Sequence, residues 1–178
     1  MMTPTVLILP GFGNSGPKHW QTLWEQAHSD FRRVDQKDWN NPICEEWVAS
    51  LELALENANL DVILVAHSMA CLVVAHWANK PHTRIKGALL VAVPNTKRET
   101  FPKVALGFDE TPTAIFDFPS IVVASTNDEY ASLDYAASLA KSWGSKFVDV
   151  GAKGHINATS GLGEWEEGFA LLEKLRKG

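Results

Sequence analysis

The stretch DVILVAHSMACLVVAHW, from Asp61 to Trp77, places one small polar island between two apolar runs. The first run, DVILVA, shows no alternation of polar and apolar residues, which is typical of a strand buried on both faces of a sheet. The second run begins at Ser68 and has the length of a helix that is apolar on nearly every side. A buried strand followed at once by a buried helix indicates an α/β protein with a parallel sheet.

Apolar runs of strand length recur along the chain and alternate with helical patterns. The predicted strands are Val6–Leu9, Phe31–Asp35 (the weakest), Asp61–Ala66, Lys86–Ala92, Ser120–Ser125 and Lys146–Val150. The predicted helices are Pro17–His28, Pro42–Asn57, Ser68–Asn79, Tyr130–Trp143 and Gly163–Leu175. This alternation favours right-handed crossovers with helices on both faces of the sheet. We therefore predict a three-layer α/β/α sandwich on a mostly parallel sheet of about six strands, with residues 1–178 forming one domain.

The segment 94–119 interrupts the alternation, because it contains four prolines and little periodicity. Proline removes a backbone donor and breaks the interior of helices and strands. We interpret this segment as an excursion over the carboxyl edge of the sheet, with room for one short helix. No part of the sequence has the pattern of a large cap domain.

Composition argues against several classes of function. Lys plus Arg number 16 and Asp plus Glu number 21, which gives a net charge of −5, whereas a nucleic-acid-binding protein is expected to be basic. No apolar run reaches the length of a membrane span, and the start of the chain lacks the pattern of a signal peptide, so we expect a cytoplasmic protein without a membrane partner. The two cysteines, Cys44 and Cys71, belong to no pattern of metal ligands, and Cys71 is expected to be a buried small hydrophobe. No metal or cofactor is implied.

Ser68 is the first candidate for a catalytic residue. A sharp strand-to-helix turn lifts a serine hydroxyl towards the carboxyl edge of the sheet, where α/β proteins bind their ligands. The usual motif for this turn, G-x-S-x-G, is not met, because Ala66 and Ala70 stand in place of its glycines. The alternative is that Ser68 only caps the following helix. The pentapeptide AHSMA alone leaves both interpretations open.

A catalytic serine needs a base, and the six histidines differ in how well they fit that role. His155 follows the last predicted strand in GAKGHIN, where two glycines permit a sharp bend. His67 is next to Ser68 in the chain, so its ring should point away from the serine. His19 lies near the loop 10–15 and is a candidate for lining the site. The remaining histidines are expected in packing or surface positions: His28, His76 and His82.

An acid must orient the base, and Asp128 is the candidate because it lies in the loop after a predicted strand, in STND. Glu129 is a rival that we assign to the first turn of the following helix. Asp149 is expected inside a strand, facing away from the edge. The chain order Ser68, Asp128, His155 is the order nucleophile, acid, base that is expected of α/β-hydrolases.

An oxyanion hole requires two backbone N–H donors. The residue after the nucleophile, Met69, is expected to supply one. The loop LPGFGNSG after the first predicted strand is expected to supply the other, from Phe12, because Gly11 and Gly13 allow the backbone to turn inward. A phosphate-binding loop is the competing interpretation, but GFGNSG lacks the lysine of a P-loop and matches no complete G-x-G-x-x-G pattern.

These motifs together resemble the small serine hydrolases typified by retinoblastoma-binding protein 9 and the bacterial YdeN-like proteins, over nearly the whole length. The resemblance is carried by PG at 10–11, HWQTLW at 19–24, the DW…P segment Asp38–Pro42, HS at 67–68, STND at 125–128 and GH at 154–155. It implies a compact α/β-hydrolase fold without a large cap, and it implies that Ser68, Asp128 and His155 form the triad. It implies no particular substrate.

The leading hypothesis is a serine hydrolase that cleaves a small ester, thioester or amide through an acyl-enzyme intermediate, with a small acyl compound as its substrate. Transfer of the acyl group to an acceptor other than water would use the same residues. No protein partner is indicated. Beside the catalytic groups, the predicted pocket residues are Gly11, Trp39, His67, Phe101 and Phe108.

The alternative hypothesis is a non-catalytic binding or scaffold module on a hydrolase fold, since a fold does not determine a function. In that case Trp20, Trp24 and Trp39 are candidates for a recognition surface near one edge. Core packing is the ordinary role of most tryptophans, so labelling of Ser68 by a fluorophosphonate probe is the observation that separates the two hypotheses.

Overall fold

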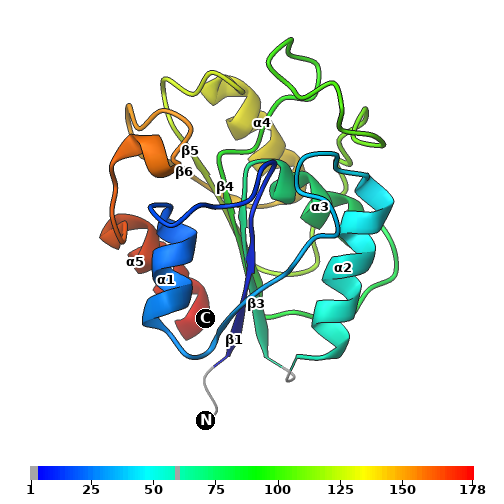
Figure 1. The fold of residues 1–178 in the computed structure, drawn as a ribbon, viewed down its shortest axis with the longest axis vertical. Helices are drawn as coiled ribbons and strands as arrows, with labels where there is room; N and C mark the ends of the chain where they lie inside the picture. Colours follow the sequence, from blue (N-terminus) through cyan, green and yellow to red (C-terminus); the bar gives the residue numbers. More distant parts are fainter. Residues whose placement is uncertain (1–3, 59–60) are drawn as a thin grey trace.

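The computed structural model describes residues 4–58 and 61–178. Its strands are β1 (Thr5–Leu9), β2 (Phe31–Arg33), β3 (Val62–His67), β4 (Gly87–Val91), β5 (Ser120–Ala124) and β6 (Lys146–Asp149). They form one sheet in the order β2-β1-β3-β4-β5-β6, in which every neighbouring pair is parallel (Figure 1). All residues of β3, β4 and β5 are buried, as their continuous apolar runs predict.

Helices cover both faces of this sheet, so the predicted three-layer α/β/α architecture is confirmed. The helices are α1 (Trp20–Ala27), α2 (Cys44–Glu56), α3 (Met69–Ala78), α4 (Leu133–Trp143) and α5 (Glu166–Lys177), with a short 3-10 turn, η1 (Ala158–Ser160). Figure 1 shows α1 and α5 on one side of the sheet and α2, α3 and α4 on the other. Alternate side chains of β3 enter the two layers: Ile63 packs with α1 and α5, and Leu64 packs with α2, α3 and α4.

Three helices, α1, α4 and α5, begin three residues later than the sequence pattern predicts. The His19 side chain caps α1 by accepting the N–H of Gln21, and Ser132 caps α4 in the same way, so each helix starts after its capping residue. Helix α5 likewise starts three residues after its predicted start. As a result, Tyr130 lies in the loop before α4, and Glu129 lies there too. The prediction that Glu129 enters the first turn of the helix is therefore wrong.

The segment 94–119 forms an excursion at the carboxyl side of the sheet, as predicted, but it contains turns and no helix. Its middle is anchored to the start of α2 by a short parallel bridge between Ile43 and Leu106. Leu106 accepts the N–H of Cys44 at 2.9 Å and donates its own N–H to Pro42 O at 2.9 Å. The predicted short helix does not form, because the prolines leave runs too short to stabilise one.

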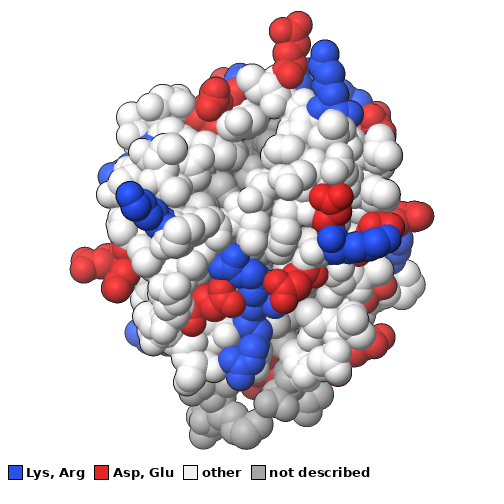
Figure 2. Space-filling model, in the orientation of Figure 1, with Lys and Arg blue, Asp and Glu red and all other residues white. Residues whose placement is uncertain are grey.

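The surface carries charges of both signs, and Figure 2 shows them interspersed over the face in view. Within residues 4–58 and 61–178, no helix is long and apolar enough to cross a membrane. The same part of the chain holds no group of three or more His, Cys, Asp or Glu side chains arranged to hold a metal ion. Cys71 is fully buried, and its Sγ donates to the backbone oxygens of Ala66 and Val91.

Candidate active site

Ser68 lies on the tight turn between β3 and α3, at the carboxyl edge of the sheet. Its backbone has φ 55° and ψ −125°, a conformation that non-glycine residues rarely adopt. The Ser68 N–H donates to Val91 O at 2.8 Å, and the Ser68 side chain makes no capping hydrogen bond to α3. The interpretation of Ser68 as a simple helix cap is therefore wrong, and its hydroxyl is available to the cavity.

The close approach of another loop explains why this turn requires small residues. Gly11, after β1, packs so closely on the turn that a Cβ there would lie 2.9 Å from His67 O and 3.0 Å from Ser68 Cβ. Only glycine fits at that distance. Ala66 and Ala70 are buried within the turn itself, at 0% and 1% exposure, so their methyl groups are accommodated. The glycine that this site requires is therefore on the opposing loop.

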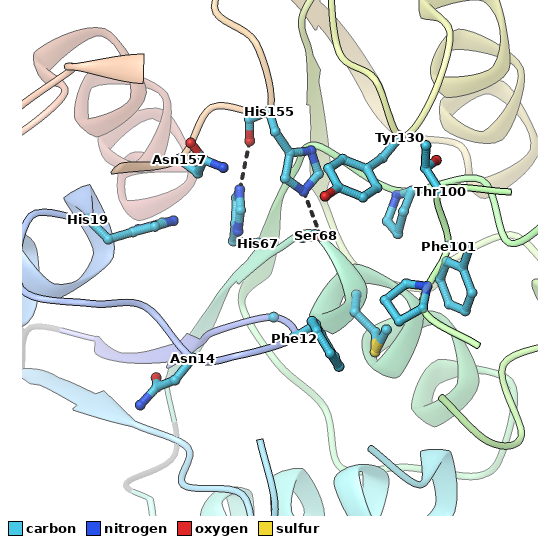
Figure 3. A pocket seen from close by; sticks show the side chains of 14 residues that line it. Phe12, Asn14, His19, His67, Ser68, Thr100, Phe101, Tyr130, His155 and Asn157 are labelled. Atoms are coloured by element: carbon cyan, nitrogen blue, oxygen red, sulfur yellow. Dashed lines mark hydrogen bonds between the residues drawn. The ribbon is translucent and has the colours of Figure 1, made fainter. Parts of the chain in front are cut away.

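His155 and Asp128 meet Ser68 at the same edge, and they come from loops that follow different strands. The Ser68 hydroxyl is 2.8 Å from His155 Nε2, and His155 Nδ1 is 3.0 and 2.9 Å from the two Asp128 carboxylate oxygens (Figure 3). A carboxylate only accepts, so His155 donates from Nδ1 and accepts the serine proton at Nε2. The Asp128 and His155 side chains are only 4% and 10% exposed, which keeps water from competing for these bonds.

The loop that carries His155 is held by side chains from the end of β5. Asn127 Oδ1 accepts the Ser125 hydroxyl at 2.9 Å and the Gly154 N–H at 2.7 Å. The Ser125 hydroxyl in turn accepts the Lys153 N–H at 2.8 Å. The STND sequence thus supplies Asp128 and also fixes the two residues that precede His155.

A second set of bonds holds the loop after His155. Ile156 is fully buried with φ 48°, and its carbonyl accepts the indole N–H of Trp20 at 2.8 Å. Ser160 donates its hydroxyl to Lys153 O at 2.6 Å and accepts the N–H of Asn157 at 3.1 Å. His155 is therefore fixed from both sides by groups on α1, on η1 and in the loop after β5.

Two backbone N–H groups beside Ser68 are available to an oxyanion. In the part of the chain that the structure describes, the N–H groups of Phe12 and Met69 have no hydrogen-bond acceptor. The next amides along the same loop are occupied, because Gly13 donates to Trp39 O and Asn14 donates to Gly11 O. Met69 also begins α3, whose positive dipole end faces the site. This geometry fits the predicted oxyanion donors.

A cavity of about 410 Å³ opens over Ser68. Its lining residues are Gly11, Phe12, Asn14, His19, His67, Ser68, Met69, Pro94, Thr100, Phe101, Pro102, Tyr130, His155 and Asn157. No Lys, Arg, Asp or Glu is among them. Of the predicted pocket residues, Gly11, His67 and Phe101 line this cavity, and so does His19.

Trp39 and Phe108, by contrast, do not line the cavity, so their prediction as pocket residues is wrong. Phe108 is only 1% exposed and its ring meets that of Trp47 edge-on, with 6.4 Å between centroids. Trp39 packs against the same Trp47 ring at 5.7 Å. Both rings fill the space between α2 and the excursion. In that position more of their apolar surface is removed from water than at the edge of the cavity.

Two buried histidines stand beside the candidate triad. His67 donates from Nε2 to the carbonyl of His155 at 2.9 Å, which turns its ring away from Ser68. Burial first, and then the neighbouring His19 and His155, hold the pKa of His67 well below its usual value. Burial first, and then Arg33 and His155, lower the pKa of His19 to about 4. Both rings are therefore neutral at neutral pH.

Sequence reasoning missed Tyr130, Thr100 and Asn157, and it placed Asn127 in a candidate loop without giving it a role. Tyr130 was assigned to a helix, yet its ring lies 4.3 Å from that of His155 and its N–H donates to Asp128 Oδ1 at 2.9 Å. Burial raises the pKa of the Tyr130 phenol, so its hydroxyl stays protonated in the cavity. A sequence signal for Tyr130 was available, because the cluster of polar residues directly after β5 extends as far as Tyr130.

The chain is similar to known proteins over nearly its whole length. The model of the serine hydrolase family matches residues 6–174. The Bacillus subtilis protein YdeN is 24% identical over 173 residues, which cover 90% of each chain, and its crystal structure aligns with a TM-score of 0.81 over 99% of this chain and all of the other. The structure of a YdeN-like protein from Pectobacterium atrosepticum aligns with a TM-score of 0.89 and 31% identity, over 98% of this chain and 91% of the other. The chain therefore has the α/β-hydrolase fold and belongs to the serine hydrolase family.

Proposed function

We propose that this hydrolase cleaves small esters, and by the same route thioesters or amides, through an acyl-enzyme on Ser68. The observation that carries the proposal is the unbroken chain of hydrogen bonds from Ser68 through His155 to Asp128, at 2.8 and 2.9 Å. These separations are within the range that proton transfer to a base requires. The strained turn presents the hydroxyl to the cavity rather than to the helix.

In the first half of the reaction, Ser68 Oγ attacks the substrate carbonyl carbon while its proton passes to His155 Nε2. Asp128 stabilises the resulting imidazolium through the Nδ1–H bond. The oxyanion accepts hydrogen bonds from the N–H groups of Phe12 and Met69. When the tetrahedral intermediate collapses, the bond to the alcohol, thiol or amine breaks, and His155 returns the proton to that leaving group.

In the second half, water attacks the acyl-enzyme and gives its proton to His155 Nε2. The second tetrahedral intermediate collapses by breaking the bond to Ser68 Oγ, which takes the proton back, and the carboxylic acid departs. An alcohol or amine that replaces water at this stage would yield acyl transfer instead. Because the cavity lining has no formally charged Lys, Arg, Asp or Glu, it suits an uncharged acyl group of modest size.

The test is the Ser68→Ala variant, compared with wild type and with Ser138→Ala, which changes an exposed serine on α4. We expect Ser68→Ala to lower kcat/KM for p-nitrophenyl acetate by roughly 1,000-fold or more while its thermal unfolding stays cooperative. Ser138→Ala should match wild type. A fluorophosphonate probe should label wild type at Ser68, as mass spectrometry of the peptide would report. Turnover by Ser68→Ala at the wild-type rate would refute the assignment.

The binding-module hypothesis loses its main support, because Trp20 and Trp24 are each only 1% exposed and Trp39 packs on the core. They form no recognition surface of the kind that the sequence suggested. A folded wild-type protein that never labels at Ser68 and hydrolyses no ester would nevertheless favour a binding role.

A further inference from the structure

The cavity over Ser68 has two chemically different sides. Figure 3 shows His19, His67 and Asn157 on one side of Ser68, and Phe12 and Phe101 on the other, where the hydroxyl-bearing Thr100 and Tyr130 also lie. We call the first group the polar side of the cavity. These residues line the same space as Ser68 and His155, so a substrate bound at the serine touches both sides. The candidate catalytic groups do not by themselves require a polar side.

His19 holds an unused donor beside this polar side, and Figure 3 shows its ring directed towards His67. Its Nδ1 accepts the N–H of Gln21 at 3.2 Å, so in the neutral ring the proton is on Nε2. In the described part of the chain, Nε2 has no hydrogen-bond partner, although the residue is 96% buried and lines the cavity. A buried N–H without a partner costs free energy, so such a group is rarely left without a role.

The ring is held in its neutral form, which makes this group a donor without charge. Burial is the main cause of the lowered pKa of His19, about 4, and the Arg33 charge contributes. An imidazolium would be poorly solvated at this position. The neutral ring keeps one N–H on Nε2, which has no partner among the described residues, and keeps its acceptor nitrogen on the helix cap.

Asn157 adds a second donor to the polar side. Its Oδ1 accepts both the N–H and the hydroxyl of Thr159, at 3.0 and 2.7 Å, which fixes the orientation of the amide. Among the described residues, its Nδ2 has no acceptor. Figure 3 shows this nitrogen directed towards His67 and the cavity. Two neutral donors, from η1 and from the start of α1, thus converge on the polar side.

We propose that His19 and Asn157 bind an oxygen acceptor of the substrate, a hydroxyl or carbonyl close to the scissile bond. The substrate class is then an ester or amide with such an oxygen on one side of that bond and an apolar group against Phe12 and Phe101. A buried donor left without a partner disfavours the analogue that lacks the oxygen. This inference rests on the proposed function of the same site, because it names what the serine hydrolase selects.

Two substitutions of His19 separate substrate binding from helix capping. In His19→Asn, the side-chain oxygen can still cap α1, but no atom reaches the position of Nε2. In His19→Gln, the amide nitrogen lies close to that position, but the cap is lost. The matched control is His28→Asn, at the other end of α1, where the ring stacks on Phe31 away from the cavity.

The measured quantity is the ratio of kcat/KM between a hydroxylated ester and its methyl analogue. One pair varies the alcohol, 2,3-dihydroxypropyl butanoate against 2-methylbutyl butanoate. The other varies the acid, methyl 3-hydroxybutanoate against methyl 3-methylbutanoate. In at least one pair we expect His19→Asn to lower the ratio about fivefold to tenfold, the effect of one lost hydrogen bond. His19→Gln and His28→Asn should keep the wild-type ratio, and His19→Gln alone should lower the melting temperature.

Fluorophosphonate labelling of wild type separates this inference from the proposed function. If wild type labels at Ser68 but both ratios agree within twofold in all four proteins, the role of His19 is refuted and the serine hydrolase stands. Equal loss of the ratio in His19→Asn and His19→Gln would show a structural effect and refute it as well. If folded wild type neither labels nor hydrolyses any of the four esters, the proposed function fails, and this inference fails with it.

Discussion

The nucleophile turn (residues 66–70) and the histidine loop (residues 150–157) meet at the same cavity, but different forces hold them. The turn lies at the centre of the sheet, between β3 and α3, and all its residues except Ser68 are buried. The histidine loop follows β6, the edge strand, whose residues are mostly exposed. Packing holds the turn, whereas side-chain hydrogen bonds from Ser125, Asn127 and Trp20 hold the loop.

This difference shows how each loop keeps an unusual backbone conformation. Ser68 has φ 55° and Ile156 has φ 48°, and each such conformation costs about 1–3 kcal/mol unless its surroundings enforce it. The conformation of Ser68 is enforced by close contacts in a packed core. The conformation of Ile156 is enforced by the Trp20 indole and by the turn at η1. Steric changes should therefore damage the turn, and loss of polar atoms should damage the loop.

Gly11→Ala tests the packing of the nucleophile turn. The new methyl carbon would lie 2.9 Å from His67 O and 3.0 Å from Ser68 Cβ, and both atoms are fixed by the buried turn. The strand end must move, and the Phe12 amide must move with it. We expect kcat/KM for p-nitrophenyl acetate to fall about 100-fold or more, through loss of an oxyanion donor and of alignment.

The matched control is Gly16→Ala on the same loop, where a Cβ would meet no atom within 4 Å. This variant should keep wild-type activity. If Gly11→Ala were as active as wild type, with an unchanged melting temperature, the turn would be more compliant than its packing implies, and the contrast with the histidine loop would be lost.

Asn127→Ala tests the polar support of the histidine loop. It removes the acceptor that joins the Ser125 hydroxyl to the Gly154 N–H, and so loosens the residue before His155. We expect kcat to fall about 30-fold with little change in KM, because Asn127 does not line the cavity and acts only by positioning His155, the proposed base. Steady-state kinetics with the ester substrate would separate the two constants.

Asn127→Asp provides the rescue, because its carboxylate keeps an oxygen for both donors. It should recover most of the lost kcat, whereas Asn57→Ala, at the exposed end of α2, should change neither constant. A carboxylate variant as slow as Asn127→Ala would show that the Oδ1 bonds do not position His155.

The same contrast explains which parts of the molecule could be predicted from the sequence. The sheet, the helices and the placement of Ser68 could be predicted from continuous apolar runs such as 61–66. A strand that is buried on both faces requires apolar residues at successive positions, and this pattern is visible in the sequence. Asp128 and His155 followed from their position after later strands. The strand ends of a parallel sheet converge at one edge, so chain order sufficed for them.

No comparable sequence pattern marks the residues that hold the histidine loop in place. Asn127 and Asn157 each act through one side-chain oxygen, which accepts one backbone N–H and one hydroxyl, and any loop contains such residues. The aromatic residues Trp39 and Phe108 were misplaced for a related reason. An apolar side chain near a site serves the core or the cavity equally well in sequence, and only the path of segment 94–119 decides between them.

The pH dependence of stability tests the point where the two regions join. His67, at the end of β3, donates to the carbonyl of His155, and His19 packs edge-on against the His67 ring at 4.7 Å. Both rings have a lowered pKa in the folded protein, to about 4 for His19, whereas the value in the unfolded chain is near 6.5. Below about pH 6.5, the unfolded chain therefore binds protons that the folded protein excludes.

As the pH is lowered from about 6.5 towards 4, the free energy of unfolding should decrease by about 1.4 kcal/mol per pH unit for each of these histidines. Above pH 7 both rings are neutral in both states and contribute no slope. Urea unfolding of wild type and His19→Asn at pH 7.5, 6.0 and 5.0 would measure this, since the variant lacks one of the titrating rings. If the free energies of unfolding of the two proteins decrease in parallel as the pH is lowered, His19 is protonated in the folded state. The contact between the turn and the loop would then not be made by two neutral histidine rings.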